Sequence, residues 1–219
     1  MRQYFTRDLR KRTIWMLIGV TVMGITIQFL NMTQLGPDPY SAMNYGISGR
    51  TGISFGTCQM TFNLILFLLL FWQNKKLFGL GTIGNMIVVG YAADLTGWVI
   101  DKLGIFPAPE DWTLGLSIGV MIPALIVFMF AAALYMNCGL GTSPYDALPY
   151  LLHQKIEKAV KKTIPFKITR IVYDGLAAVI AFLIGGDCGI VTVLMVFFLG
   201  PCIDVVSGLV KKSGIFTEK

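Results

Sequence analysis

The feature that most constrains this chain is a series of six long apolar runs that carry almost no charge. They occupy residues 13–33, 57–73, 79–100, 114–137, 168–186 and 188–210. An α-helix needs about 20 consecutive apolar residues to cross a bilayer, so the runs predict an all-α integral membrane protein with six transmembrane helices. Of the 219 residues, 55% are hydrophobic and 14% are charged, whereas soluble domains carry about 25% charged residues.

Basic residues gather in the segments that flank these runs. They lie before residue 13, at Lys75 and Lys76, across 155–170, and at Lys211 and Lys212. The positive-inside rule places such segments in the cytoplasm, and six helices put all of them on one side, with both termini cytoplasmic. The rule also explains the net charge of +6 without a nucleic-acid partner. The expected surroundings are therefore a lipid bilayer.

A short motif, Leu-Gly-x-x-Pro-Tyr-x-Ala, occurs twice, each time directly after an apolar run. The two copies span residues 35–42 and 140–147. In each copy, a glycine suits the positive φ that ends a helix, and a proline suits the first position of a new helix. Asp38 and Ser143 precede the prolines as N-caps. The motif therefore predicts short broken helices over about 39–47 and 144–152.

A longer similarity links residues 79–106 with residues 189–216, and it aligns Asp94 with Asp204. The chain is thus expected to form one membrane domain from two repeats, residues 1–106 and 107–219. Each repeat has three spans and one short helix. Because three is an odd number, the second repeat is inverted relative to the first. Secondary transporters use this plan to build a substrate site near the bilayer midplane, and a channel can share it.

The candidate substrate site lies where the two short helices begin. A helix N-terminus carries partial positive charge and free N–H groups, and broken helices present such ends to solutes in transporters. The predicted substrate-binding residues are Pro39, Tyr40, Ser41, Ser143, Pro144, Tyr145, Asp146 and Asn63. The structural alternative is a pair of surface turns. Gln59 and Asn85 serve either as cavity lining or as contacts between helices.

Charged residues inside the predicted spans form a second group of candidates, because such charges are costly in a bilayer and are usually functional or paired. Asp94 is expected to pair with Arg50 in an outer layer. Asp204 is expected to pair with Arg170 in an inner layer. Asp174 lies one helical turn beyond Arg170 and is expected to pair with it too. These pairs are predicted as gates or as sites of proton or ion coupling; static pairs that fix helix packing are the alternative.

No sequence feature points to a metal ion, a cofactor or a catalytic centre. The cysteines lie in or beside apolar runs without a C-x-x-C pair, which is typical of buried thiols; they are Cys58, Cys138, Cys188 and Cys202. The phosphate-binding pattern G-x-x-x-x-G-K-[ST] is absent from the sequence. Asp174 and Asp187 would lie about 20 Å apart along one helix, too far to share a catalytic water. The chain is therefore predicted not to be an enzyme.

The stretch GLGTSPYDAL, residues 139–148, follows an apolar run. This turn and the hydropathy plan resemble the YczE/YitT-type group of small bacterial integral membrane proteins. The resemblance covers most of the chain. It implies a bacterial cytoplasmic membrane location and a role in transport, and it carries over no ligand residues.

The first functional expectation is a membrane transporter or channel for a small solute, with secondary transport coupled to ions or protons. A substrate-binding membrane subunit of a multi-protein importer is the second; it would copurify with ATPase subunits. An intramembrane enzyme and a structural or regulatory protein are further alternatives. Helix N-termini favour an anion or zwitterion, while the acidic spans favour a cation, so the substrate class stays open. Six short spans enclose little volume, and a homodimer is as compatible with them as a monomer.

Overall fold

The computed structural model describes the backbone of residues 2–213 and the side chains of residues 8–213. This part of the chain contains α-helices and two 3₁₀ turns (Lys75–Leu77 and Pro109–Asp111) but no strand, so the predicted all-α class is confirmed. The helices are α1 (Arg2–Met32), α2 (Pro39–Thr51), α3 (Phe55–Phe71), α4 (Leu80–Leu103), α5 (Leu114–Asn137), α6 (Pro144–Val160), α7 (Phe166–Leu183) and α8 (Ile190–Lys212). The last residues of the second predicted repeat, 214–219, lie outside the described residues.

Four of the described helices are long and apolar enough to cross a membrane: α1 from Asp8, α4, α5 and α8. A fifth span is counted if α2 and α3, which are bent by 117° at the break between them, act as one broken span. A helix occupies each of the six predicted places. However, α3 has only 17 residues, and α7 has 18 that include Lys167, Arg170 and Asp174. The protein is thus a multi-pass helical membrane protein with four or five candidate spans, against six predicted.

The outward faces of the helices are apolar, as lipid contact requires. Leu69 of α3, Phe182 of α7 and Val205 of α8 are each more than 60% exposed. Soluble monomers rarely leave large continuous apolar surfaces in contact with water. These faces therefore contact the lipid bilayer.

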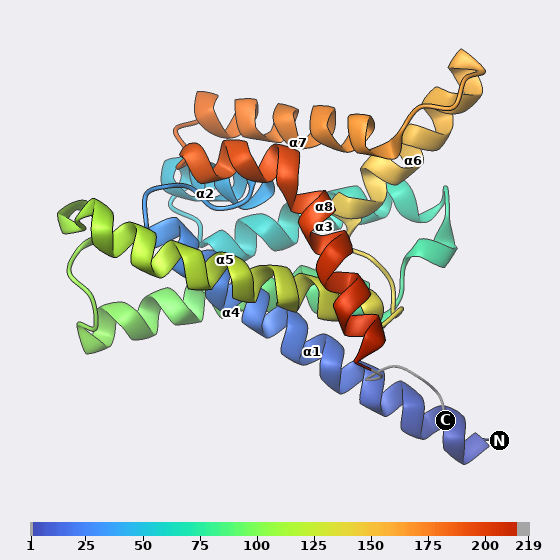
Figure 1. The fold of residues 1–219 in the computed structure, drawn as a ribbon, viewed down its shortest axis with the longest axis horizontal. Coiled ribbons are helices and arrows are strands. Elements are labelled where there is room, and N and C mark those ends of the chain that lie inside the picture. Colours follow the sequence, from blue (N-terminus) through green and yellow to red (C-terminus); the bar gives the residue numbers. More distant parts are fainter. Residues whose placement is uncertain (1, 214–219) are drawn as a thin grey trace.

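Both predicted short helices are present, and both extend beyond the predicted ends. α2 continues to Thr51, where Gly52 ends it with a φ of 71°. α6 continues to Val160 and ends at Lys161, a non-glycine residue with a φ of 54°. The second half of α6 is rich in lysine and projects from the body of the molecule (Figure 1). The short helix was predicted to end at about residue 152 because the apolar pattern ends there, before the helix does.

The helices pack as two groups that α4 and α8 connect. α1 lies against α4 and α5 in one group, while α2 packs on α7 and α3 on α6 in the other (Figure 1). α4 also contacts α3, and α8 contacts both α5 and α7. Figure 1 shows that α8 bends partway along its length. Pro201 lies inside this helix, where a proline removes one backbone hydrogen bond and kinks the helix.

The two loops that carry the repeated motif are each fastened to the start of a helix that is distant in sequence. The backbone N–H of Val191, at the start of α8, donates to the carbonyl oxygen of Leu35 at 3.0 Å. The backbone N–H of Gly81, at the start of α4, donates to the carbonyl oxygen of Leu140 at 2.7 Å. The loop of each half is therefore held by the last helix of the other half.

Two threonine hydroxyls repeat this reciprocal contact. Thr192 of α8 donates to the carbonyl oxygen of Pro37 at 2.7 Å. Thr82 of α4 donates to the carbonyl oxygen of Thr142 at 2.8 Å. Backbone carbonyl groups of both loops are thus satisfied inside the molecule, as buried backbone requires.

The glycine of each motif copy has the positive φ that the sequence predicts. Gly36 has a φ of 92° and Gly141 a φ of 106°. A side chain would not fit at either position, because a Cβ at Gly36 would overlap Thr192 Oγ1 and a Cβ at Gly141 would lie 2.5 Å from the backbone nitrogen of Gly79. Glycine is required here by both conformation and space.

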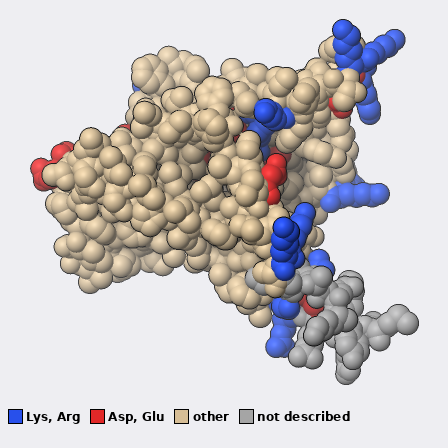
Figure 2. Space-filling model, viewed as in Figure 1, with Lys and Arg blue, Asp and Glu red and all other residues tan. Residues whose placement is uncertain are grey.

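Charge separates along the molecule. Lys and Arg side chains gather at the end that holds the start of α1, the α6–α7 loop and the end of α8 (Figures 1 and 2). Acidic side chains mark the opposite end, where α4 connects to α5 (Figures 1 and 2). The basic segments that are separate in sequence are therefore neighbours at one end of the fold.

Candidate functional site

A cavity of about 340 Å³ lies between the helices, and both copies of the motif line it. Sites for small molecules usually have volumes of about 300–1,000 Å³, so this cavity matches a small solute. Its charged and amide-bearing side chains are Asp38, Gln59, Asn85, Asp146, Lys167, Arg170 and Asp204. The structure thus gathers polar groups from α3, α4, α6, α7 and α8 and from the loop before α2 around one space.

The tyrosines of the two motif copies meet in this cavity. The rings of Tyr40 and Tyr145 stack with their centroids 4.1 Å apart and their planes 26° apart. Both residues are buried. The hydroxyl of Tyr40 donates to the backbone oxygen of Gln59 at 3.3 Å, whereas that of Tyr145 donates to Asp174 Oδ1 at 2.8 Å. The two turns therefore contact each other through equivalent residues.

Both helix starts carry the predicted N-caps. Asp38 Oδ1 accepts from the backbone N–H of Ser41 at 3.1 Å, and Ser143 Oγ accepts from that of Asp146 at 3.0 Å. The Ser143 hydroxyl in turn donates to Asp146 Oδ2 at 2.7 Å. The two caps therefore contain the same residue types in reversed order, Asp-x-x-Ser before α2 and Ser-x-x-Asp before α6.

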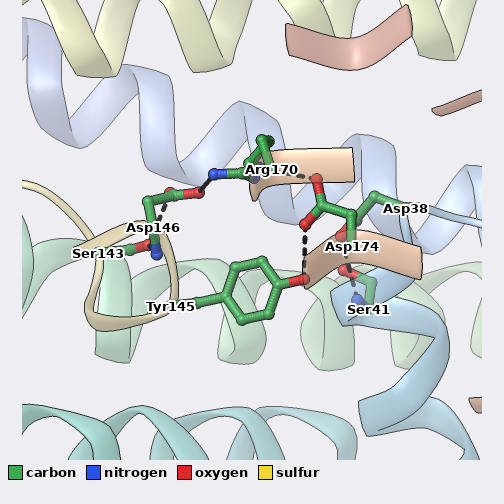
Figure 3. Close-up of polar contacts among 7 residues, drawn as sticks. All are labelled: Asp38, Ser41, Ser143, Tyr145, Asp146, Arg170 and Asp174. Atoms are coloured by element: carbon green, nitrogen blue, oxygen red, sulfur yellow. Dashed lines mark hydrogen bonds and ion pairs between the residues drawn. The ribbon is translucent and has the colours of Figure 1, made fainter. Parts of the chain in front are cut away.

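Arg170 joins two carboxylates in the second half of the site (Figure 3). Its Nε lies 2.7 Å from Asp174 Oδ2 and its Nη1 lies 2.7 Å from Asp146 Oδ1. The predicted pairing of Arg170 with Asp174 is therefore confirmed. Tyr145 also donates to Asp174, so both carboxylates and the guanidinium group have partners. Such pairing offsets the desolvation cost of burying these charges.

The predicted pairing of Asp94 with Arg50 is wrong. Asp94 Oδ2 instead accepts from the backbone N–H of Gly56 at 2.9 Å, at the start of α3. Arg50 donates to the carbonyl oxygens of Leu183 and Ile184 at 3.1 and 2.6 Å, at the end of α7. Helix ends leave backbone groups without intrahelical partners, and these two charges satisfy such groups.

The predicted pairing of Asp204 with Arg170 is also wrong. Arg170 is bound by Asp146 and Asp174. Asp204 is exposed and, among the described side chains, it forms no ion pair. Asp204 and Arg170 nevertheless line the same cavity, so the sequence identified the neighbourhood but not the partner.

The structure brings together most of the predicted substrate-binding residues. Tyr40, Ser41, Ser143, Tyr145 and Asp146 line the cavity. Pro39 and Pro144 begin α2 and α6 without lining it, and Asn63 is fully buried in α3 away from the lining.

Sequence reasoning missed further lining residues, among them Phe128 and Tyr135 of α5 and Lys167 of α7. The run at 114–137 is apolar on all sides, so its sequence does not indicate which face points inward. Lys167 lies at the end of a span and was assigned to the basic loop. Only the packing of these helices reveals that their side chains reach the cavity.

One end of the cavity is closed and the other reaches the molecular surface. Asp38, Ser41 and Gln59 are buried. The side chains of Arg170 and Asp146 are 24% and 31% exposed. The cavity therefore opens beside the Arg170 network and is sealed at the start of α2.

Comparison with known proteins gives a family. The model of a family described as "Family of unknown function (DUF6198)" matches residues 10–208, so the chain belongs to that family. An uncharacterized protein of Haemophilus influenzae is 25% identical over 86% of this chain and 80% of its own length. The uncharacterized protein YyaS of Bacillus subtilis is 26% identical over 89% of this chain and 92% of its own. No solved structure matches. This is a multi-pass membrane protein with bacterial homologues.

Proposed function

We propose that this member of the DUF6198 family is a secondary transporter for a small solute, with its binding site in the cavity between the two motif copies. The observation that carries the proposal is the meeting of two equivalent helix starts around one space of about 340 Å³, with Tyr40 stacked on Tyr145. Secondary transporters commonly place their substrate where broken helices of two repeats meet.

The proposal includes an inverted repeat of three spans and one short helix. The hydrogen bonds Leu35–Val191 and Leu140–Gly81 support it, because in each of them the motif loop of one half binds the start of the last helix of the other half. The packing partners exchange in the same way: α1 on α4 corresponds to α5 on α8, and α2 on α7 corresponds to α6 on α3. In this scheme α3 and α7 are the two remaining spans, and the Arg170–Asp174 pair lowers the cost of charge in α7.

The one-sided opening of the cavity supports alternating access. The half at Asp146 and Arg170 is open, and the half at Asp38 is buried. A rocking motion of one repeat against the other would close the cavity at Arg170 and open it at the start of α2. The bend at Pro201, whose side chain lines the cavity, is a suitable hinge.

The orientation follows from charge. The basic end of the molecule in Figure 2 is assigned to the cytoplasm by the positive-inside rule. Both ends of the chain are then cytoplasmic, in the cytoplasmic membrane of a bacterium. The open half of the cavity, at Arg170 and Asp204, belongs to the same end in this assignment.

Thiol accessibility in membrane vesicles tests alternating access. The four native cysteines are replaced by alanine, and single cysteines are introduced as Asp204→Cys, Ser41→Cys and, as a lipid-facing control, Leu69→Cys. A charged methanethiosulfonate reagent that cannot cross the bilayer is then applied from either side. We expect Asp204→Cys to react from the cytoplasmic side only, and Ser41→Cys to react more slowly and from the opposite side only.

Two results would contradict the proposal. Reaction of both positions from both sides of the bilayer would indicate a continuous channel. If Asp204→Cys reacts with the reagent while Ser41→Cys stays unreactive from both sides, the cavity is static and never opens at α2.

A further inference from the structure

Building on the proposed function, we propose that the solute is a small organic cation with N–H donors, such as a primary ammonium ion, and that its charged group binds between Asp38 and Gln59. Four observations carry this assignment: the charge of the cavity, its unpartnered acceptors, its aromatic walls and the difference between its two halves.

The cavity carries more negative than positive side chains. Of the residues in and directly behind its wall, four are carboxylates and two are basic: Asp38, Asp146, Asp174 and Asp204 against Lys167 and Arg170. Arg170 is already bound to two of these carboxylates at 2.7 Å. An excess of negative charge in a low-dielectric site attracts cations and opposes anionic solutes.

The wall of the cavity contains buried polar atoms without partners. Among the described side chains, Asp38 Oδ2, Gln59 Oε1 and Tyr135 Oη are buried and have no hydrogen-bond partner. The three residues are 8%, 3% and 2% exposed, and all three line the cavity. Buried polar groups nearly always have a partner. Two of these atoms can only accept, and an ammonium group supplies three N–H donors.

Aromatic rings line the same cavity. Tyr40, Tyr145, Tyr135 and Phe128 all line the cavity. The guanidinium carbon of Arg170 lies 5.7 Å from the centre of the Tyr145 ring, so this wall already accepts one cation. Aromatic faces attract cations that have lost part of their hydration.

The two halves differ in how the carboxylate of each N-cap is paired, and this difference indicates where the cation binds. Asp146, beside the start of α6, is bound by Arg170. Asp38, beside the start of α2, has no such cation among the described side chains, and Figure 3 shows its only drawn contact, with Ser41. α3, which follows α2 in the chain, has neutral Gln59 and Asn63 as its fifth and ninth residues, where α7, which follows α6, has Arg170 and Asp174. A bound ammonium ion would thus do for Asp38 what Arg170 does for Asp146.

A series of four-carbon probes with different head groups tests the chemistry. The full chain, purified in detergent, is titrated with n-butylammonium, n-butyltrimethylammonium, n-butyrate and n-butanol while its thermal unfolding is followed. We expect n-butylammonium to raise the unfolding temperature in a saturable way, by mass action on the folded state. The trimethylated probe should bind at least about fivefold more weakly because it lacks N–H donors, and the other two should have no effect.

Matched variants test the position. Asp38→Asn removes the charge and keeps an N-cap, while Asp94→Asn removes the same charge outside the cavity and keeps an acceptor for Gly56. We expect the affinity for n-butylammonium to fall about tenfold or more in Asp38→Asn and less than about twofold in Asp94→Asn.

Three outcomes would overturn the assignment: stabilisation by n-butyrate instead of n-butylammonium, an equal effect of both variants, or no binding by either cation. None of these would by itself refute the transporter proposal, which the thiol accessibility experiment decides separately. Loss of alternating access together with binding of n-butylammonium would leave the cation site standing and refute transport.

Discussion

The two motif copies have the same backbone and different polar chemistry. In both, a glycine with positive φ, a proline-started helix and a buried tyrosine occur at equivalent positions, and in both the loop is fastened to the last helix of the other half. The helix that follows the second copy in the chain, α7, provides Arg170 and Asp174 as its fifth and ninth residues. The helix that follows the first copy, α3, provides Gln59 and Asn63 at the same places.

This difference distinguishes the features that maintain the fold from those that form the site. Contacts that join the halves are repeated because both loops need the same backbone geometry and the same partners. Charges around the cavity are not repeated, because one half satisfies its carboxylates internally and the other leaves Asp38 with an unpartnered oxygen among the described side chains. Repeated features should therefore respond equally to mutation, and unrepeated features unequally.

The largest expected effect comes from removing Arg170, whose place in α3 is held by neutral Gln59. Arg170→Gln leaves Asp174, which is 3% exposed, as a buried charge without its cation. We expect a loss on the order of 4 kcal/mol in the free energy of unfolding, measured in mixed detergent micelles. Gln59→Met, the equivalent change in α3, should cost less than about 0.5 kcal/mol, because the Gln59 Oε1 atom has no hydrogen-bond partner among the described side chains.

A double variant converts the second half into a copy of the first. Arg170→Gln with Asp174→Asn recreates the Gln–Asn pair of α3, so no unpaired carboxylate remains at position 174. It should recover at least half of the stability that Arg170→Gln loses. A double variant no more stable than Arg170→Gln would show that the cost does not arise from the unpaired carboxylate.

The glycines of the motif test the repeated geometry. Gly36→Ala and Gly141→Ala each place a Cβ against the opposite half and require a non-glycine residue at positive φ. Strain and overlap together should lower the free energy of unfolding by about 3 kcal/mol in each variant. The two losses should be similar in the same unfolding assay. Gly49→Ala is the control, because a Cβ there meets no atom within 4 Å. A large difference between the first two would break the equivalence of the turns.

The smallest expected effect separates the two tyrosine hydroxyls. Tyr145→Phe removes a 2.8 Å hydrogen bond to Asp174, and bonds to charged groups contribute about 1.5–3 kcal/mol. Tyr40→Phe removes a 3.3 Å bond to a neutral backbone oxygen and should cost about 0.5 kcal/mol. Since both variants keep the ring stack, unequal losses measure the hydroxyl environments alone. Equal losses would mean that charge does not distinguish the halves.

Much of the architecture was determined by the sequence. Runs of apolar residues indicate membrane helices because backbone groups in lipid must be satisfied within a helix. The Gly, Pro and N-cap residues of the motif act on their own backbone, so Gly36, Asp38 and Ser143 could be assigned without knowing any neighbour. The pairing of Arg170 with Asp174 was predictable for the same reason, since positions four apart share one helix face.

Only the tertiary structure decided the partners of charges that lie on different helices. Asp94 and Arg50 bind helix ends, and Arg170 binds Asp146 of α6, because side chains satisfy whichever unpaired group the packing brings within reach. An apolar helix such as α5 has no face marked in its sequence, so the inward position of Tyr135 depends on how α5 packs against α1 and α8. Spacing along one helix is a local property, whereas a cavity forms from distances between helices that no local pattern contains.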